Sequence, residues 1–384
     1  MKYTSEYREN RTVIQIAQAI SQMTTHPWNI MEICGGQTYA IAYYRLQEIL
    51  PSQITLLHGP GCPVCVTPEP TIDLAVDLAL RPATILATFG DMMRVPGSRE
   101  DLLHAKARGA DVRLLYSPLD AVQLAEENKD KEVIFFAIGF ETTLPVHLTA
   151  LREALRRGLT NFSLLTSFFR VSPAVESILQ DPRSVVDAFL TAGHVCAITG
   201  NAAYRKLSEQ YQTPMAVTGF EPADLLYGIY CCIDMLERGT YNVVNAYKRA
   251  VPEEGNPKAR ALMDEMLEPC PRDWRGIGKI PDSGLRLREK YAPYDAEKRF
   301  AETWHATSPG TAHNRDAARH ISATSSKTII GHQKQTCIAG DIMRGYKQPA
   351  QCPCFGTTCT PDHPVGAPMV SQEGSCATFY LIDN

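Results

Sequence analysis

The sequence predicts an α/β protein built on parallel sheets, and three observations support this fold class. Between about residues 30 and 220, short apolar runs alternate regularly with amphipathic segments of helical spacing. Several of the runs end in glycine, as at Gly90, Gly139, Gly200 and Gly219. After about residue 250 the alternation stops, and glycine and proline recur every few residues from 340 to 368. Because regular alternation of strand and helix indicates βαβ units, we expect parallel sheets followed by a loop-rich segment.

The bounds of the expected elements follow from the spacing of apolar residues. The first helix covers 9–22, where Val13, Ile16 and Ile20 recur at helical spacing. The expected strands are 30–33, 54–57, 84–88, 112–115, 133–138, 162–165, 194–198 and 215–217. The further expected helices are 72–80, 99–108, 119–128, 145–157, 173–179, 201–209, 225–236 and 257–267. Residues 274–284 are expected to be a loop, and 305–328 an exposed insert of low apolar content.

Eight strands make one large sheet or two small ones, and the segments 116–118 and 211–214 look like crossings between two lobes. We therefore expect two lobes with parallel sheets, Rossmann-like or thioredoxin-like. The first consists of 28–118 and 214–240, and the second of 119–213. Residues 1–27 and 241–384 are expected to form a third domain, rich in loops and helices.

Composition excludes several classes of protein. The 384 residues are 44% hydrophobic and 21% charged, which is typical of a globular chain and not of a disordered one. The net charge of −4 and the absence of a basic stripe argue against nucleic-acid binding. No apolar run approaches the length of a membrane span, and the first residues lack the apolar stretch of a signal peptide. We expect a soluble, cytoplasmic protein that works without a membrane.

Twelve cysteines are unevenly spread, and those near the end of the sequence carry the strongest signal. The spacing is C-x14-C-x6-C-x16-C for Cys337, Cys352, Cys359 and Cys376, with Cys354 as an extra thiol. Four thiolates on a loop-rich segment suit an iron–sulfur cube or a structural zinc ion. Zinc sites usually carry closely paired cysteines, so the wide spacing favours iron–sulfur. Zinc and unmetallated cysteines stay open as alternatives.

Two further thiol motifs follow predicted strands. Cys62 and Cys65 form a C-x-x-C pair between a strand and a helix, which is the layout of a thiol–disulfide site. The alternatives are half of a zinc site or a buried pair. Cys34 ends the first strand before two glycines, and parallel strands would bring it to the same sheet edge. Three thiols in one cleft suggest a soft metal with a redox pair nearby, although a lone cysteine is more often simply buried.

Three acids also follow predicted strands: Asp91, Glu141 and Glu221. The carboxyl ends of parallel strands are where open α/β sheets bind ligands, so these acids are candidate site residues. The alternative is that each caps the helix that follows it.

Seven segments of the sequence resemble the HypD family of hydrogenase-maturation proteins, in the same order over nearly the whole chain. They are MEICGGQTYAI (31–41), HGPGCPVCVTP (58–68), TFGDMMRVPGS (88–98), FFAIGFETT (135–143), TGFEPADLL (218–226), WRGIGKIPDSGLRLREKY (274–291) and CIAGDIMRGYKQPAQCPCFGTTCTPDHPVGAPMVSQEGSC (337–376). The resemblance implies two α/β domains and a third domain with a [4Fe–4S] cluster. It also implies a scaffold for the Fe(CN)2CO part of the [NiFe]-hydrogenase site.

The resemblance implies a role for each thiol. Cys34 would bind the iron together with a cysteine of a small HypC-type chaperone, and a HypE-type protein would donate cyanide. Cys62 and Cys65 would be the redox pair. The cluster ligands would be Cys337, Cys352, Cys359 and Cys376, and the hydrogenase large subunit would be served indirectly. The departures from the family pattern are Tyr39 where histidine is frequent, the extra Cys354 and the insert 305–328.

The expected function is therefore an assembly scaffold with redox capability rather than a turnover enzyme. One alternative is a free-standing iron–sulfur thiol–disulfide oxidoreductase. Another is a zinc-stabilised interaction module without redox chemistry.

Overall fold

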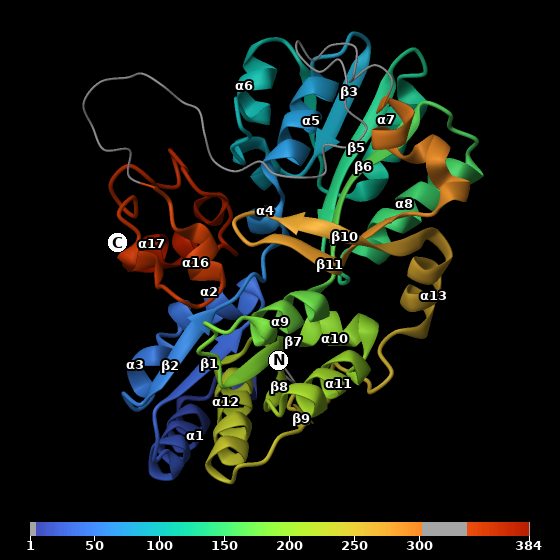
Figure 1. Ribbon diagram of the computed structural model, residues 1–384. Helices are drawn as coiled ribbons and strands as arrows, with labels where there is room; N and C mark the ends of the chain where they lie inside the picture. Colours follow the sequence, from blue (N-terminus) through green and yellow to red (C-terminus); the bar gives the residue numbers. More distant parts are fainter. Residues whose placement is uncertain (1–4, 302–335, 384) are drawn as a thin grey trace.

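The computed structural model describes residues 5–301 and 336–383, so the predicted insert 305–328 lies outside the described residues. Within them the chain forms two sheets, as the α/β prediction required (Figure 1). The first sheet has the order β2-β1-β7-β8-β9 and all its strands are parallel. These strands are β1 (Trp28–Glu32), β2 (Ile54–His58), β7 (Ala188–Ala192), β8 (Met215–Thr218) and β9 (Val243–Asn245).

The second sheet has the order β10-β11-β6-β5-β3-β4. The four neighbouring strands β6, β5, β3 and β4 are parallel to one another, whereas β11 runs antiparallel to both β6 and β10. The strands are β3 (Thr84–Thr88), β4 (Asp111–Leu114), β5 (Glu132–Gly139), β6 (Phe162–Phe169), β10 (Leu267–Trp274) and β11 (Gly278–Leu287). The first of these, β3, is buried over its whole length, as expected of a strand covered on both faces.

Helices cover both faces of each sheet (Figure 1). Around the first sheet they are α1 (Asn10–Met23), α2 (Gly35–Tyr43), α3 (Leu46–Ile49), α9 (Val171–Gln180), α10 (Gly193–Thr199), α11 (Ala202–Tyr211) and α12 (Pro222–Glu237). Around the second sheet they are α4 (Pro63–Val66), α5 (Glu69–Ala79), α6 (Leu102–Ala107), α7 (Pro118–Glu127), α8 (Leu144–Arg156), α13 (Pro257–Met266) and α14 (Ala296–Arg299). Short 3-10 helices are η1 (Ser5–Tyr7), η2 (Gly90–Arg94) and η3 (Glu289–Tyr294).

The last described residues form a compact segment, which lies beside both sheets in red in Figure 1. It contains α16 (Ala339–Met343), η4 (Pro349–Gln351), η5 (Ala367–Met369) and α17 (Ser375–Asp383). One continuous hydrophobic core extends from this segment through both sheets and includes Met31, Leu86, Phe189 and Met343. The two sheets are therefore packed into one body rather than joined by a flexible linker.

The sheets divide the strands differently from the predicted lobes. The prediction kept 28–118 together, but β3 pairs with β5 in the second sheet and β4 pairs with β3. The chain leaves the first sheet after β2 and returns to it at β7. A βαβ unit looks the same in sequence whether its next strand joins the same sheet or another, so no composition change marked these crossings.

Two predicted elements are wrong and four strands were missed. Residues 194–198 form helix α10, and the strand β7 precedes them. Residues 188–198 are mostly apolar, and the change from strand to helix falls at Gly193, where an added Cβ would lie 2.3 Å from the carbonyl oxygen of Thr218. The expected loop 274–284 is a tight turn followed by most of β11. The missed strands are β7, β9, β10 and β11, of which the last two form an antiparallel hairpin.

Candidate functional site

The carboxyl ends of the parallel strands of the first sheet bring together four residues from separate parts of the sequence. Cys34 follows β1, His58 ends β2, His194 follows β7 and Phe220 follows β8. These four strands are consecutive neighbours in the sheet, in the order β2-β1-β7-β8. Their ends therefore form one edge, which is where open α/β sheets place their ligands.

A buried carboxylate, Glu32, organises this edge. Glu32 and His58 are directly paired in the register of β1 and β2, and the His58 Nδ1–Glu32 Oε1 distance is 2.8 Å. The backbone N–H of Cys34 donates to Glu32 Oε2 at 2.9 Å, and the Thr38 hydroxyl donates to Oε1. Glu32 is 1% exposed, so these bonds replace the water that burial removes. The carboxylate thus holds the backbone of Cys34 against the neighbouring strand.

The thiol of Cys34 lies in a pocket of aromatic and imidazole rings. Its Sγ is 3.8 Å from both ring nitrogens of His194, whose ring packs against Phe220 with centroids 5.3 Å apart. Burial raises the pKa of Cys34 well above its usual range and lowers the pKa of His194 to about 4. At neutral pH the site therefore holds a neutral thiol beside a neutral imidazole, both of which are soft-metal ligands once the thiol proton is lost.

Cys62 and Cys65 are joined by a disulfide on the segment that leads from the first sheet to the second. This segment packs on Cys34, because the N–H of Gly35 donates to the Gly61 carbonyl at 3.1 Å. A Cβ added to Gly61 would lie 2.4 Å from the Cα of Cys34, so only glycine permits this approach. The structure thus brings the C-x-x-C pair to the edge that carries Cys34, as the sequence predicted.

The carboxylate of Glu373, which sequence reasoning missed, approaches Cys34 from the C-terminal segment. A Cβ on Gly35 would lie 2.3 Å from the Glu373 carbonyl oxygen. Burial raises the pKa of Glu373, and the nearby charge of Asp91 raises it further. The negative charge of Glu373 in turn contributes to the raised pKa of Cys34. The charge of Asp91 thus acts on Glu373, and that of Glu373 acts on Cys34.

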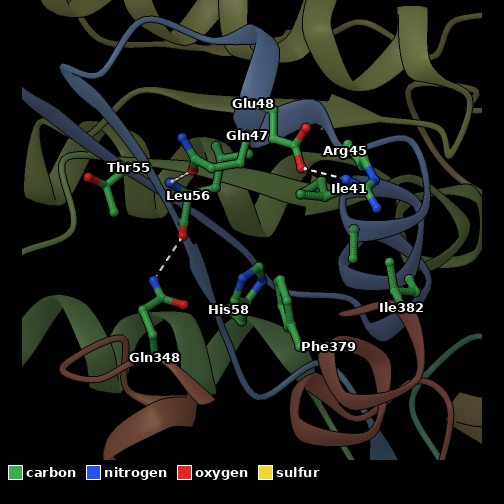
Figure 2. A pocket seen from close by; sticks show the side chains of 11 residues that line it. Ile41, Arg45, Gln47, Glu48, Thr55, Leu56, His58, Gln348, Phe379 and Ile382 are labelled. Carbon is green, nitrogen blue, oxygen red and sulfur yellow. Dashed lines mark hydrogen bonds and ion pairs between the residues drawn. The ribbon is translucent and has the colours of Figure 1, made fainter. Parts of the chain in front are cut away.

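A cavity of about 310 Å3 opens beside His58, and Figure 2 shows its side chains. Ile41 and Phe379 line it, and the ring of Phe379 lies 4.8 Å from that of His58 between centroids. Gln348 Nε2 donates to the Leu56 carbonyl at 3.2 Å, which ties the C-terminal segment to β2. Helix α17 thus covers the outer side of the His58–Glu32 pair.

The C-terminal cysteines gather in one hydrophobic cluster. Cys352, Cys354, Cys359 and Cys376 are buried, and Cys337 packs against them while partly exposed. The N–H of Val365 donates to Cys359 Sγ at 3.3 Å, a bond that stabilises a thiolate. Burial raises the pKa of Cys337 to about 11 and that of Cys376 further, and the neighbouring thiols add to both shifts. Such a donor set fits a sulfur-ligated metal group, although no three His, Cys, Asp or Glu side chains in the described ranges already surround a point where a metal ion could bind.

Comparison with known proteins decides the family. A family model named HypD, described as "Hydrogenase formation hypA family", matches residues 11–383. The chain belongs to the HypD family. It is similar to the hydrogenase maturation factor HypD of Rhizobium leguminosarum bv. viciae, with 41% identity over 99% of this chain and 95% of the relative. The HypD of Escherichia coli K12 is 39% identical over 99% of this chain and 98% of that protein.

Two departures from the HypD family pattern have clear positions. Tyr39 is 42% exposed on α2 and stacks on Tyr43, so it does not enter the thiol pocket. His194 supplies an imidazole there from another strand end. Cys354 is buried among the four predicted cluster cysteines. The structure thus places a fifth thiol, that of Cys354, among the predicted cluster ligands.

The other two predicted acids are used structurally. Glu141 is buried and accepts the N–H of Val171 at 3.0 Å, which caps the start of α9. Burial raises the pKa of Glu141 to about 7. Glu221 begins α12, but its side chain is paired with Arg8, with an Nη2–Oε1 distance of 2.8 Å. These bonds tie Glu141 to α9 and Glu221 to the N-terminal residue Arg8.

Sequence reasoning missed Glu32, His58, His194 and Glu373 as members of the site. Glu32 ends strand β1, at a position where a carboxylate normally faces solvent, and only its pairing with His58 shows why it is buried. His194 was assigned to a strand that is really α10. The sequence signal that could have identified His58 is its position directly before the Gly-Pro-Gly turn. Within the described residues, no helix has the length and apolar character needed to cross a membrane.

Proposed function

We propose that this member of the HypD family of hydrogenase maturation factors is a scaffold on which the Fe(CN)2CO unit of the [NiFe] site is assembled. The observation that carries the proposal is Cys34, a buried thiol at a sheet edge with His194 at 3.8 Å and a disulfide on the adjoining segment. The iron is the cargo, and a small HypC-type chaperone would supply the second thiolate. A HypE-type protein would donate cyanide, and the hydrogenase large subunit would receive the product indirectly.

Burial gives Cys34 the properties that a transient iron ligand needs. A thiol whose pKa is raised keeps its proton, and so remains unreactive, until a metal replaces that proton. The Glu32 carboxylate fixes the backbone of Cys34 before any metal arrives, because it accepts the Cys34 N–H at 2.9 Å. Neutral His194 can accept a hydrogen bond from the thiol or contact the bound iron unit.

The C-x-x-C pair would supply two electrons next to this thiol. Reduction of the Cys62–Cys65 disulfide takes up two electrons and two protons, and reoxidation releases them. The N–H of Cys65 lies 3.3 Å from Cys62 Sγ, where it would stabilise a thiolate after reduction. Both cysteines are nearly fully buried, at 3% and 2% exposure. A large partner disulfide cannot reach them without a rearrangement, which favours an internal redox role over the alternative of a free-standing oxidoreductase.

We propose that the C-terminal segment binds a [4Fe–4S] cluster through Cys337, Cys352, Cys359 and Cys376. When bound, such a cluster supplies one-electron chemistry. The buried thiols provide four sulfur ligands, and the Val365 N–H already points to one of these sulfurs. Cys337 is the most exposed of the four and would lie on the side open to a reductant. The cytoplasm, where thiols stay reduced, is the expected compartment.

The test is an infrared spectrum of the full chain, purified without oxygen from cells that also produce its small chaperone and the cyanide donor. We expect bands of metal-bound cyanide and carbon monoxide in the wild type and none in Cys34→Ala. Cys232→Ala is the matched control, since Cys232 is also buried but lies in α12 and donates to the Phe189 carbonyl. Bands that persist in Cys34→Ala, or a wild type with a cluster but no such bands, would contradict the scaffold and favour the oxidoreductase.

A further inference from the structure

A second cavity, separate from the thiol site, lies at the carboxyl ends of β5 and β6. Its volume is about 420 Å3, which is in the range of small-molecule sites. Helices α9, α11 and α13 and strands β10 and β11 contribute to its lining. None of Cys34, Glu32, His58 or His194 lines it. The cavity thus occupies the ligand-binding edge of the second sheet, as the Cys34 site occupies that of the first.

Three arginines line the open part of this cavity, and each bonds only to backbone. Arg170, Arg260 and Arg288 donate to the carbonyls of Asp282, Glu254 and Asp264 at 3.0, 2.9 and 3.0 Å. Among the described residues none of these guanidinium groups forms an ion pair with a carboxylate, unlike most other arginines of the chain. Three acids also line the cavity: Glu254 and Asp264 are exposed, whereas the buried Glu141 accepts the N–H of Val171. Outside the buried Glu141, the lining therefore carries three positive and two negative side chains.

The buried part of the lining holds a polar group without a partner. Tyr204 is 1% exposed, lines the cavity, and its hydroxyl has no hydrogen-bond partner within the described residues. A buried hydroxyl without a partner is unfavourable, by roughly 1–3 kcal/mol. Helix α11 begins at the cavity, at Ala202 to Tyr204, whereas the start of α9 is already capped by Glu141. The positive end of α11 adds to the charge of the arginines.

We propose that this cavity binds a small organic carboxylate with an apolar body. Guanidinium groups bind carboxylates through paired hydrogen bonds, and Tyr204 offers a further donor. Met263, Leu267 and Leu285 give the cavity an apolar wall that a purely inorganic anion would leave unused. The inference is independent of the iron-scaffold function, since no residue of the thiol site takes part.

The test measures binding of hexanoate to the full-length protein by saturation-transfer NMR and calorimetry, with hexylamine and hexanol as charge controls. We expect hexanoate to bind and the amine and alcohol to bind at least tenfold more weakly. The double variant Arg260→Gln/Arg288→Gln should weaken binding roughly tenfold or more, because each substitution removes a charge-assisted bond. Arg152→Gln is the matched control, an exposed arginine on α8 outside the cavity, and should leave the affinity unchanged.

A third variant distinguishes a loss of hexanoate binding from a loss of folding. Tyr204→Phe removes only the hydroxyl, so it should keep the melting temperature at or above the wild-type value and still weaken hexanoate binding several-fold. Three outcomes would overturn the proposal: no binding of hexanoate, equal binding of all three probes, or an affinity that neither the arginine pair nor Tyr204→Phe changes. Each of them leaves the infrared result for Cys34 unaffected.

Discussion

The Cys34 edge and the C-terminal cysteine segment carry thiols in opposite structural settings. Cys34 follows a buried parallel strand, and Glu32 holds its backbone through a hydrogen bond of 2.9 Å. The described residues 336–383 contain helices but no strand, and four of their five cysteines lie outside the helices, whereas Cys376 lies in α17. The first site is ordered by the sheet and needs no metal to form. The second has little regular structure of its own, so its order depends on what its cysteines bind.

The C-terminal segment contacts the rest of the chain through the shared hydrophobic core and through single side-chain hydrogen bonds. Arg94 donates to the carbonyls of Pro361 and Val370 at 2.9 and 3.3 Å, and the Tyr346 hydroxyl donates to Asp181. Because the segment has little regular structure, removal of the proposed metal group should loosen it while the sheets stay folded. We therefore expect the two cysteine sites to respond differently to metal loss: the Cys34 edge should stay ordered, and the C-terminal segment should loosen.

The largest expected effect is on the C-terminal segment. Cys352→Ala should abolish the cluster, with loss of labile sulfide, and should make residues 336–383 at least roughly tenfold more sensitive to protease because metal binding supplies their folding energy. Sulfide analysis and limited proteolysis measure this. Cys270→Ala, a buried cysteine of β10 outside the cluster, is the control. A Cys352→Ala protein with full sulfide content would show that Cys354 replaces the lost ligand.

Glu141, a buried carboxyl group that follows β5 of the second sheet and lies away from both thiol sites, should dominate the pH dependence of the free energy of unfolding. Burial raises the pKa of Glu141 from 4.5 to about 7, so the folded state binds this proton more tightly than the unfolded state. The stability it contributes is complete below pH 4.5 and is lost as pH rises to about 7, by about 3 kcal/mol. Glu141→Gln should remove that loss.

The measurement is the free energy of unfolding from urea titrations between pH 4.5 and 7.5, as wild type minus Glu141→Gln. The difference is needed because burial lowers the pKa of His147 and of His194 to about 4, and these histidines make the folded state less stable as pH falls. A difference that does not change with pH would mean that Glu141 titrates normally.

A smaller effect tests whether the Cys34 edge is held by the sheet and its buried carboxylate. Glu32→Gln keeps the shape but removes the charge that binds His58 and Thr38, which should lower the free energy of unfolding by about 2 kcal/mol. Sulfide content should stay at the wild-type value. Loss of both stability and sulfide in this variant would show that the two regions depend on each other.

The smallest effect concerns Glu221, which the sequence suggested as a site residue. Arg8 and Glu221 form an ion pair with Arg8 largely exposed, and such pairs contribute little to stability. Arg8→Gln should therefore leave the melting temperature, the sulfide content and the infrared bands unchanged. A loss of the cyanide and carbon monoxide bands would instead give Glu221 a direct role at the iron site.

Much of the fold could be predicted because apolar periodicity reports local structure directly. Helix α1, expected at 9–22, is found at Asn10–Met23, and β5 extends the expected strand by one residue at each end. The allocation of β3 and β4 to the second sheet could not be predicted, because pairing between strands depends on contacts distant in sequence.

The dependence of strand pairing on contacts distant in sequence also decides which site residues could be predicted. Cys34, Cys62 and Cys65 follow strands, and motif spacing placed them at one edge. Glu32 and His194 belong to the site only through strand register and through the correct start of α10. Neither relation is visible in the local sequence.

The central claim, that Cys34 and the C-terminal cysteines bind two different kinds of iron, is tested most directly by Mössbauer spectroscopy. The protein is enriched in the Mössbauer isotope of iron and purified without oxygen together with its small chaperone. We predict two iron species in the wild type: a four-iron cluster and a single low-spin iron. Cys34→Ala should lose only the low-spin species and keep the cluster. A Cys34→Ala spectrum with both species intact, or with both lost, would contradict the account.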